Sequence, residues 1–297
     1  MSRWLDDLRQ TAGARRAFWT PLCLAALNAA PDLACAEALA VVLREGMFAG
    51  PEARALGYSS VSLGKLWPVD LPGYLKERRG VVSTEQAVAG FDVAGGRVRR
   101  VRLAGGGGGD ADAVVCALPL PSFLEVCPAE IRGRYASLEG MGFSPLLSVT
   151  LWFDRPVFDD PFAALLDTDV HWVFNRTALW GRRSALAGCL SLTISDARAF
   201  AHDPSDRVVE RALADLRRVL PGLPEPRHAA VVWERQATPT PTPAFWKARP
   251  PTATPLENFF LAGDWVDSGL PPTIEAACRS GHAAAAAAKR FLDDNVA

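Results

Sequence analysis

The order of apolar and polar positions predicts a helical beginning to the chain. In residues 3–45, apolar side chains recur at helical spacing, and Pro21 suits the first turn of a helix because its φ is already fixed. The apolar run of residues 34–45 ends at Gly46, where we expect a C-cap. These helices can be ordinary core helices or the wall around an apolar substrate.

Short apolar runs predict a β-rich middle, in which a continuous apolar run is typical of a buried strand. The predicted strands are residues 80–88, 98–103, 111–118, 146–153, 171–174, 189–194 and 229–233. Residues 46–80 are irregular and close with a helical stretch over 71–79, whereas residues 206–220 form an amphipathic helix. Strands interleaved with helices indicate an α/β or α+β chain with mixed sheets.

Two unusual segments predict connections instead of sites. The five glycines of residues 105–109 join two predicted strands and do not lead into a helix N-terminus, so we expect a hairpin turn and no phosphate loop. The proline-studded residues 238–255 cannot form regular structure and are expected to wrap the surface in extended form.

Charge and composition exclude several classes of function. The chain has 297 residues, with 32 basic and 33 acidic side chains, so its net charge of −1 gives no footprint for nucleic acid. No window reaches the ~18 uninterrupted apolar residues of a membrane-spanning helix. The N-terminus carries Asp6 and Asp7 where a secretory peptide has its apolar core, which favours a cytoplasmic protein.

The metal-ligating and nucleophilic residue types show no site pattern. The six cysteines include no C-x-x-C pair, and we expect reduced thiols that pack in or near the core. The four histidines lack zinc-site spacing, so no metal is expected. G-x-S-x-G and G-x-x-x-x-G-K-[ST] are both missing from the sequence, which removes local support for a serine hydrolase or a nucleoside triphosphatase.

Residues 258–292 carry the chemistry that the sequence reveals. They predict a strand at 258–262, a turn at 267–272 and a helix of about 20 residues that begins at Thr273. Gly263 lets a ligand approach the backbone, and the adjacent Asp264 can accept hydrogen bonds from sugar-like hydroxyls. Unpaired N–H groups at the helix start suit an electron-rich acceptor such as the N1–C2=O edge of a flavin.

A strand–loop–helix unit alone is weak evidence for a cofactor site, but the full string is specific. L-A-G-D-W-x-D-S-G-L-P-P-T-I-E-A-A-x-x-S-G, residues 261–281, resembles the C-terminal flavin motif of amine oxidases and phytoene-desaturase-like enzymes. The chain is most similar to the squalene-associated FAD-dependent desaturases, also called hydroxysqualene dehydroxylases. Residues 18–28, 112–119 and 233–250 resemble further parts of that group, so the resemblance covers nearly the whole chain.

The resemblance implies FAD as the cofactor and assigns roles by position. Asp264 would bind the ribitol chain, and Gly263 would permit close backbone approach. Thr273 and Ile274, which follow Pro272, would offer backbone N–H groups to the isoalloxazine ring. Val88, which ends the predicted strand of residues 80–88, resembles the position whose backbone meets the adenine. No catalytic acid or base is predicted.

The sequence departs from the family where the pyrophosphate is normally held. These families begin with a βαβ unit that carries G-x-G-x-x-G, and this chain contains none. We therefore expect an incomplete FAD-binding Rossmann-like domain, completed by a separate N-terminal half, or a truncated and inactive chain. The predicted division is 1–80 and 121–235 for the substrate domain, and 81–120 and 236–297 for the FAD-binding domain.

The resemblance also implies an oxidoreductase on a linear isoprenoid, in the direction of hydroxysqualene to squalene. A flavin desaturase or amine oxidase on another substrate, or a non-catalytic partner, are the alternatives. Such an isoprenoid substrate lives in the bilayer, so contact with the membrane surface, peripheral to the inner membrane, is expected. The candidate cavity residues, each also explicable as core, are Phe18, Trp19, Leu22, Leu27 and Met47.

Overall fold

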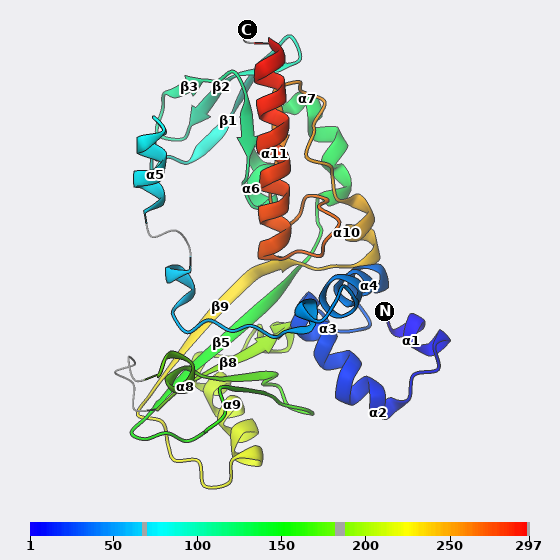
Figure 1. Cartoon of the computed structure of the whole chain (residues 1–297), viewed down its shortest axis with the longest axis vertical. Helices are drawn as coiled ribbons and strands as arrows, with labels where there is room; N and C mark the ends of the chain where they lie inside the picture. Colours follow the sequence, from blue (N-terminus) through cyan, green and yellow to red (C-terminus); the bar gives the residue numbers. More distant parts are fainter. Residues whose placement is uncertain (67–69, 182–187, 296–297) are drawn as a thin grey trace. The chain divides into compact units, whose positions relative to one another are not determined.

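The computed structural model describes residues 1–66, 70–181 and 188–295, and these form two compact units (Figure 1). The first unit combines Met1–Asp70 with Phe143–Thr240, and the second combines Leu71–Gly142 with Pro241–Ala297. Each unit is therefore built from two separated stretches of the chain. The boundaries between the units follow residues 70, 142 and 240, whereas the sequence predicted boundaries after residues 80, 120 and 235.

The first unit begins with short helices, as the sequence predicts. The α-helices are α1 (Ser2–Asp7), α2 (Ala12–Ala14), α3 (Thr20–Leu27) and α4 (Ala36–Leu43), with π-turns η1 (Arg15–Trp19) and η2 (Arg44–Phe48) and 3₁₀ turns η3 (Glu52–Arg54) and η4 (Leu63–Lys65). The predicted C-cap at Gly46 is wrong, because η2 carries the helix through it to Phe48. The backbone leaves helical geometry at Gly50, whose φ is 142°.

The described strands of the first unit form one sheet in the order β6-β7-β8-β5-β9. Their bounds are β5 (Phe143–Phe153), β6 (Phe162–Ala164), β7 (Trp172–Asn175), β8 (Gly188–Ser195) and β9 (His228–Pro239). All neighbours pair antiparallel, so the mixed sheet predicted for this domain is wrong. Antiparallel neighbours need only short connections, whereas parallel ones need a crossover of a dozen or more residues.

One face of this sheet carries the core of the first unit. Alternating residues of β5 and β8, among them Leu147, Val149 and Leu192, are almost fully buried. They pack in one cluster with Leu213 and Leu216 of the amphipathic helix α9 (Ser205–Val219). The unit is completed by α8 (Arg176–Trp180) and the 3₁₀ turn η7 (Ala197–Phe200).

The second unit contains the strands and the long helix expected of a cofactor domain. Its strands are β1 (Val88–Ala94), β2 (Arg97–Leu103), β3 (Gly108–Asp110), β4 (Val114–Cys116) and β10 (Phe259–Leu261), and its helices are α5 (Leu71–Glu77), α6 (Leu120–Val126), α7 (Ala129–Arg132), the 3₁₀ turn η5 (Gly133–Leu138), α10 (Pro243–Ala248) and α11 (Ile274–Asn295). β1, β2 and β3 form an antiparallel sheet. The glycine-rich turn after β2 is a hairpin, as predicted, but its second strand is β3 and not the predicted strand of residues 111–118.

The strands β4 and β10 form a parallel pair that packs against α11, the helix at the red end of the colour bar in Figure 1. Phe260 and Ala262 pack against Ala284 on that helix. The buried Asn258 ties this pair to β2, because its side-chain amide accepts a hydrogen bond from the Val98 N–H at 2.8 Å and donates to the Val98 carbonyl at 2.7 Å. Strands are thus present within both predicted segments, 111–118 and 258–262, and their parallel pairing is a feature that the sequence did not predict.

Residues 121–142 belong to the second unit, although we predicted them in the substrate domain. Phe123 of α6 stacks on the buried Trp265, with ring centroids 5.0 Å apart. Tyr135 of η5 packs edge-on against the same Phe123. Phe123 and Trp265 are 142 positions apart in the sequence, so no local pattern reports their contact.

The predicted strand of residues 80–88 is also wrong. β1 begins only at Val88, and the preceding residues are extended or bent without a partner strand. Val81 is 87% exposed, and Glu85 has a left-handed backbone with φ of 61°. The apolar pair at 81–82 therefore gains no sheet neighbour, and Val88 starts a strand instead of ending one.

The proline-rich residues 238–255 contain more regular structure than the sequence predicts. β9 extends to Pro239, and Pro243 starts α10, where its missing N–H costs nothing. The Thr242 hydroxyl caps this helix by accepting from the Phe245 N–H at 3.1 Å. Phe245 and Arg249 are buried, so the segment does not simply wrap the surface.

Candidate functional site

The turn after β10 places Gly263 and Asp264 at the end of the parallel strand pair. Gly263 has a φ of 140°, a conformation that side chains with a Cβ rarely adopt. A Cβ there would lie 2.8 Å from Nε1 of Trp265. Glycine is therefore required by the fold, and the same bare backbone can approach a ligand closely.

Asp264 is half-buried beside this turn, and its environment disfavours the charged form. Desolvation by burial raises the pKa of its carboxyl above 3.8, whereas hydrogen bonds from the backbone N–H groups of Asp264 and Trp265 lower it. A carboxylate held this way gains from a further hydrogen-bond donor, such as a ligand hydroxyl.

Ser280 and Trp265 hold the turn, and sequence reasoning named neither as a site residue. The Ser280 hydroxyl accepts a hydrogen bond from the Gly263 N–H at 2.9 Å and lies 3.0 Å from the Gly263 carbonyl oxygen. The fully buried Trp265 donates from its indole to the Leu118 carbonyl at 2.9 Å. Trp265 and Ser280 both lie in the flavin motif of residues 261–281, and this was the sequence signal that could have indicated that they hold the turn.

The start of α11 presents backbone donors, as the sequence predicts. The Thr273 hydroxyl accepts from the Ala276 N–H at 3.1 Å, and the Thr273 carbonyl accepts the first helical hydrogen bond from Ala277. The N–H groups of Ile274 and Glu275 lie in the first turn, where no carbonyl of the helix is placed to accept their hydrogen bonds. Pro272 is buried just before them, whereas the Ile274 side chain is 63% exposed.

Arg249 fixes the loop that leads into this helix, and no sequence pattern singled it out. Its side chain is 2% exposed and forms an ion pair with Asp267 at 3.1 Å. It also donates to the Leu270 carbonyl, and its guanidinium lies 3.7 Å from the centroid of the Trp246 ring. One planar cation therefore joins α10 to the segment between β10 and α11.

These residues fit a flavin. Gly263, with its positive φ, allows a ligand to approach the backbone closely, and the half-buried carboxylate of Asp264 can accept a hydrogen bond from a hydroxyl group. The first N–H groups of α11, a helix of 22 residues, provide a partial positive charge. Gly263, Asp264, Pro272, Thr273 and Ile274 all lie within this strand–loop–helix. Val88 is distant from this unit in the sequence, and it lies in β1, where it pairs with Leu103 of β2. Its role as an adenine contact stays a prediction.

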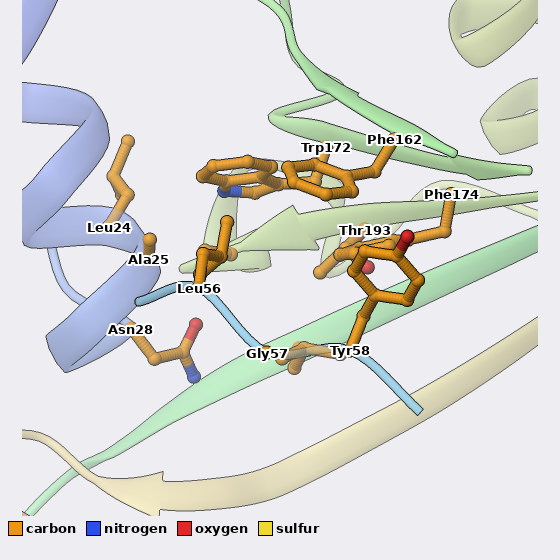
Figure 2. Close-up of a pocket in the computed structure, with 12 residues that line it drawn as sticks. Leu24, Ala25, Asn28, Leu56, Gly57, Tyr58, Phe162, Trp172, Phe174 and Thr193 are labelled. Atoms are coloured by element: carbon orange, nitrogen blue, oxygen red, sulfur yellow. The ribbon is translucent and has the colours of Figure 1, made fainter. Parts of the chain in front are cut away.

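The first unit contains an apolar cavity of 390 Å³ on the sheet face opposite α9 (Figure 2). Strand register builds its wall, because Phe162 pairs with Phe174 and Trp172 pairs with Thr193. The helix α3 and an irregular segment close the other side. The lining residues are Leu24, Ala25, Asn28, Leu56, Gly57, Tyr58, Leu146, Phe162, Trp172, Phe174, Thr193 and Ser195.

The rings in this wall form one layer. Trp172 and Phe174 alternate on β7 and stack with centroids 6.3 Å apart, and Tyr58 meets Phe162 edge-on at 6.0 Å. The amide of Asn28 donates to the Ser144 carbonyl at 3.0 Å, so it belongs to the scaffold. Within the described residues, the lining of this cavity has no charged side chain, which suits a neutral apolar ligand.

The five cavity residues predicted from the sequence lie elsewhere in the first unit. None of them lines the 390 Å³ cavity. The residues of this region that do line it are Leu24 and Ala25 of α3 and Asn28, which caps that helix. Leu27 is buried, Leu22 and Trp19 are half-buried, and Phe18 is exposed. Met47 lines a separate cavity of 560 Å³ next to η2. As contacts of a substrate, the five residues stay predictions.

Among the described residues, we find no membrane-spanning helix and no metal site. No helix among them has the length and apolar character needed to cross a membrane. No group of three or more histidine, cysteine, aspartate or glutamate side chains in the described ranges is placed to hold a metal ion. Five of the six cysteines are buried as free thiols, and Cys278 is exposed.

Comparison with known sequences connects this geometry to a family. The model for flavin containing amine oxidoreductase matches residues 6–289. Hydroxysqualene dehydroxylase of Sinorhizobium fredii is 30% identical over 284 residues, which cover 89% of this chain and 60% of that protein. 15-cis-Phytoene desaturase of Synechococcus elongatus is 24% identical over 68% of this chain and 44% of its own length. The chain thus spans about 60% of the length of this hydroxysqualene dehydroxylase and of the one from Rhodopseudomonas palustris.

Solved structures share the fold at low sequence identity. An oxidoreductase from Methanosarcina mazei superimposes on 96% of this chain and 67% of its own, with a TM-score of 0.69 and 15% identity. A putrescine oxidase superimposes on 69% of this chain and 48% of its own, with a TM-score of 0.53 and 16% identity. The arrangement of α/β elements described above is therefore an established fold.

Proposed function

This chain belongs to the flavin-containing amine oxidoreductase family, and from that premise we propose that it forms the ring-contacting and substrate-binding parts of an FAD-dependent oxidoreductase acting on a linear isoprenoid. The reaction we propose is the reductive removal of the hydroxyl group of hydroxysqualene to give squalene. The similarity to hydroxysqualene dehydroxylase supports this choice. The observation that carries it is the apolar, uncharged cavity on the free face of the antiparallel sheet.

The second unit would hold the flavin through the residues after β10. Asp264 would accept hydrogen bonds from the ribitol chain, Gly263 would let the cofactor approach the backbone, and the first N–H groups of α11 would face the ring. When bound, the flavin supplies the hydride chemistry. Arg249 and Ser280 keep this surface in place without needing to touch the cofactor.

The first unit would orient the substrate and exclude water. The aromatic layer of Tyr58, Phe162, Trp172 and Phe174 offers apolar area and ring faces to an isoprenoid chain. Apolar walls replace the water around a reacting centre, which strengthens every electrostatic interaction inside the cavity. This is the contribution that the protein itself makes to a reaction whose redox step belongs to its cofactor.

The pyrophosphate of FAD would be bound by residues that this sequence does not contain. The strand–glycine-loop–helix fingerprint that normally cradles a pyrophosphate is missing from the 297 residues. We propose that a βαβ segment, supplied ahead of these residues or as a separate chain, completes the FAD-binding domain. Contact with a membrane surface, through exposed side chains such as Phe48 and Leu56, is proposed for the delivery of the substrate.

The test combines the chain with such a segment, FAD and a reductant. Hydroxysqualene is supplied in liposomes, and squalene is measured by gas chromatography. Formation of squalene supports the proposal, and Phe174→Ala should reduce turnover by removing a ring of the cavity wall that is not part of any second cavity. Flavin reduction by a polar amine, with no squalene formed, would move the chain to the amine-oxidase alternative. A complex that binds FAD but turns over neither substrate would contradict the proposed reaction.

A further inference from the structure

A second cavity lies beside the first one, in the same unit. Its volume is 430 Å³, and it is lined by Arg16, Thr20, Pro21, Leu24, Leu165, Leu166, Asp167, Thr168, His171 and Trp172. Two residues, Leu24 and Trp172, line both cavities. They come from facing elements, because Leu24 lies on α3 and Trp172 begins β7 (Figure 2). These two side chains therefore stand between the two cavities.

This partition consists of side chains and not of backbone. Leu24 is 8% exposed and borders empty space on two sides, and Trp172 stacks on Phe174 with an angle of 21° between the rings. Rotation about side-chain torsions takes place among staggered states without moving the helix or the strand. A ligand can displace such a partition at small cost, whereas a backbone wall would resist it.

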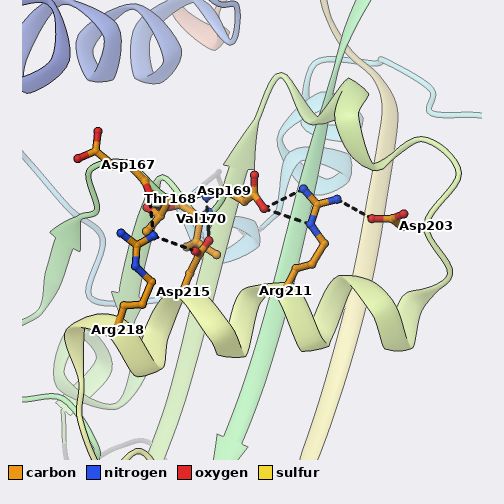
Figure 3. Close-up of polar contacts among 8 residues, drawn as sticks. All are labelled: Asp167, Thr168, Asp169, Val170, Asp203, Arg211, Asp215 and Arg218. Atoms are coloured by element: carbon orange, nitrogen blue, oxygen red, sulfur yellow. Dashed lines mark hydrogen bonds and ion pairs between the residues drawn. The ribbon is translucent and has the colours of Figure 1, made fainter.

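The outer wall of the second cavity is firmly anchored, in contrast to the partition (Figure 3). The buried Asp215 of α9 accepts hydrogen bonds from the backbone N–H groups of Asp169 and Val170 at 2.8 and 3.0 Å. Arg218 of the same helix donates to the Asp167 carbonyl at 2.9 Å. The segment that bears Leu165 to Thr168 is thereby fixed to α9.

The far end of the second cavity is polar and closed by an ion pair. Nε of Arg16 lies 2.9 and 2.7 Å from the two carboxylate oxygens of Asp167. Both side chains are about half exposed, so this pair marks the boundary with solvent. The second cavity therefore has apolar residues next to Leu24 and Trp172, and it also has polar residues, among them Thr20, Thr168 and His171, before its charged outer end.

We propose that the two cavities are one interrupted path for a single elongated isoprenoid, and that Leu24 and Trp172 set the chain length that the protein accepts. This inference rests on the proposed function, because it takes its apolar substrate from there. A short chain occupies the first cavity with the partition closed. A chain twice as long displaces the two side chains and extends toward Arg16 and Asp167.

The test measures binding by this chain alone, with two linear prenyl alcohols that share a head group. Farnesol has 15 carbons and hexaprenol has 30, and both are presented from cyclodextrin and quantified by mass spectrometry after equilibrium dialysis. Leu24→Trp should fill the partition and lower the ratio of hexaprenol affinity to farnesol affinity at least tenfold. Leu8→Trp, which adds the same ring at an exposed leucine of the same unit, is the matched control and should change neither affinity.

A second variant keeps the test decisive if Leu24→Trp does not fold. Trp172→Leu opens the partition from the strand side and should raise hexaprenol affinity severalfold relative to farnesol. Equal effects on both alcohols would overturn the path and leave the proposed function standing. Wild-type binding of farnesol without hexaprenol would overturn the path and the C30 substrate, and would leave only a shorter linear isoprenoid. Wild-type binding of neither alcohol would overturn the path and the proposed substrate class together.

Discussion

The backbone N–H of Asp196 donates a hydrogen bond of 2.8 Å to the side-chain Oδ1 of Asn28, and both residues have a left-handed backbone, with φ of 50° and 49°. The carboxylate of Asp196 in turn accepts from the Ala30 N–H at 3.2 Å. The Asn28 amide donates to the Ser144 carbonyl and, at 3.1 Å, to the Thr238 hydroxyl. One buried side chain thus joins the end of α3 to β5, β9 and the end of β8, and holds one wall of the cavity.

Replacing Asn28 should therefore destabilise the first unit. Asn28→Ala loses three hydrogen bonds. It also places alanine in the left-handed region, where its Cβ is unfavourable and its side chain forms no compensating hydrogen bond, so we expect the free energy of unfolding to fall by about 2–4 kcal/mol. Asn28→Gly loses the same hydrogen bonds but tolerates the backbone, and should cost less. Urea unfolding followed by circular dichroism measures both, and equal losses would contradict the backbone part of the argument.

His171 should make the first unit sensitive to acid. Burial lowers its pKa below 6.5, although Asp169, Asp196 and Asp215 act in the opposite direction, and its Nδ1 accepts a hydrogen bond from the Ser195 N–H at 3.0 Å. Because the unfolded chain binds the proton more readily, stability should fall as the pH drops from 6.5 through the lowered pKa.

The measurement compares urea unfolding at pH 7 and pH 5 for two variants. His171→Gln keeps a hydrogen-bond acceptor without a titrating ring, so it should lose less stability on acidification than the wild type. His202→Gln, at an exposed position, should follow the wild-type pH dependence. A steep acid loss that persists in His171→Gln would show that another group is responsible.

Arg249 should control the order of the loop before α11. Arg249→Met removes the ion pair to Asp267 and the hydrogen bond to the Leu270 carbonyl, so exchange of the amide hydrogens of residues 267–270 should accelerate at least tenfold. Arg249→Lys keeps the charge but not the planar stack on Trp246, and an intermediate effect is expected. Exchange unchanged in Arg249→Met would mean that the loop is held by its own turns.

Asp264 should oppose stability and support binding. Its raised pKa means that the folded chain holds the proton more tightly than the unfolded one, so stability is fully present below 3.8 and declines as pH rises through the folded value. Asp264→Asn removes this decline, and the cofactor-free variant should be at least as stable as the wild type at pH 7. In the completed flavoprotein the same change should weaken FAD binding by about 1.5–3 kcal/mol.

Thermal unfolding between pH 3 and pH 8 and flavin titration measure these two effects of Asp264→Asn. Asp294→Asn, on the exposed end of α11, serves as the control and should alter neither. A variant that is less stable at pH 7 and still binds FAD normally would contradict both halves of the argument and leave Asp264 as a structural cap of the turn.

Local patterns predicted the elements well wherever a segment folds on its neighbours in sequence. The amphipathic helix at 206–220 and the strands at 146–153 and 189–194 are present because their apolar spacing matches the period of the element. The strand at 80–88 and the extended proline-rich segment failed because an apolar pair does not reveal whether a partner strand exists, and proline at a helix start costs nothing.

The sequence by itself determined the flavin-type turn and helix, because Gly263, Asp264 and Thr273 lie within a dozen residues and their backbone geometry is set locally. Only the tertiary structure decided the cavity, because its wall exists once β6, β7, β8 and β5 pair in one register, which sets Phe162 opposite Phe174 and Trp172 opposite Thr193. It likewise decided which face of α3 meets that wall. The residues of α3 and those of the wall are more than a hundred positions apart in the sequence, and only packing brings them together.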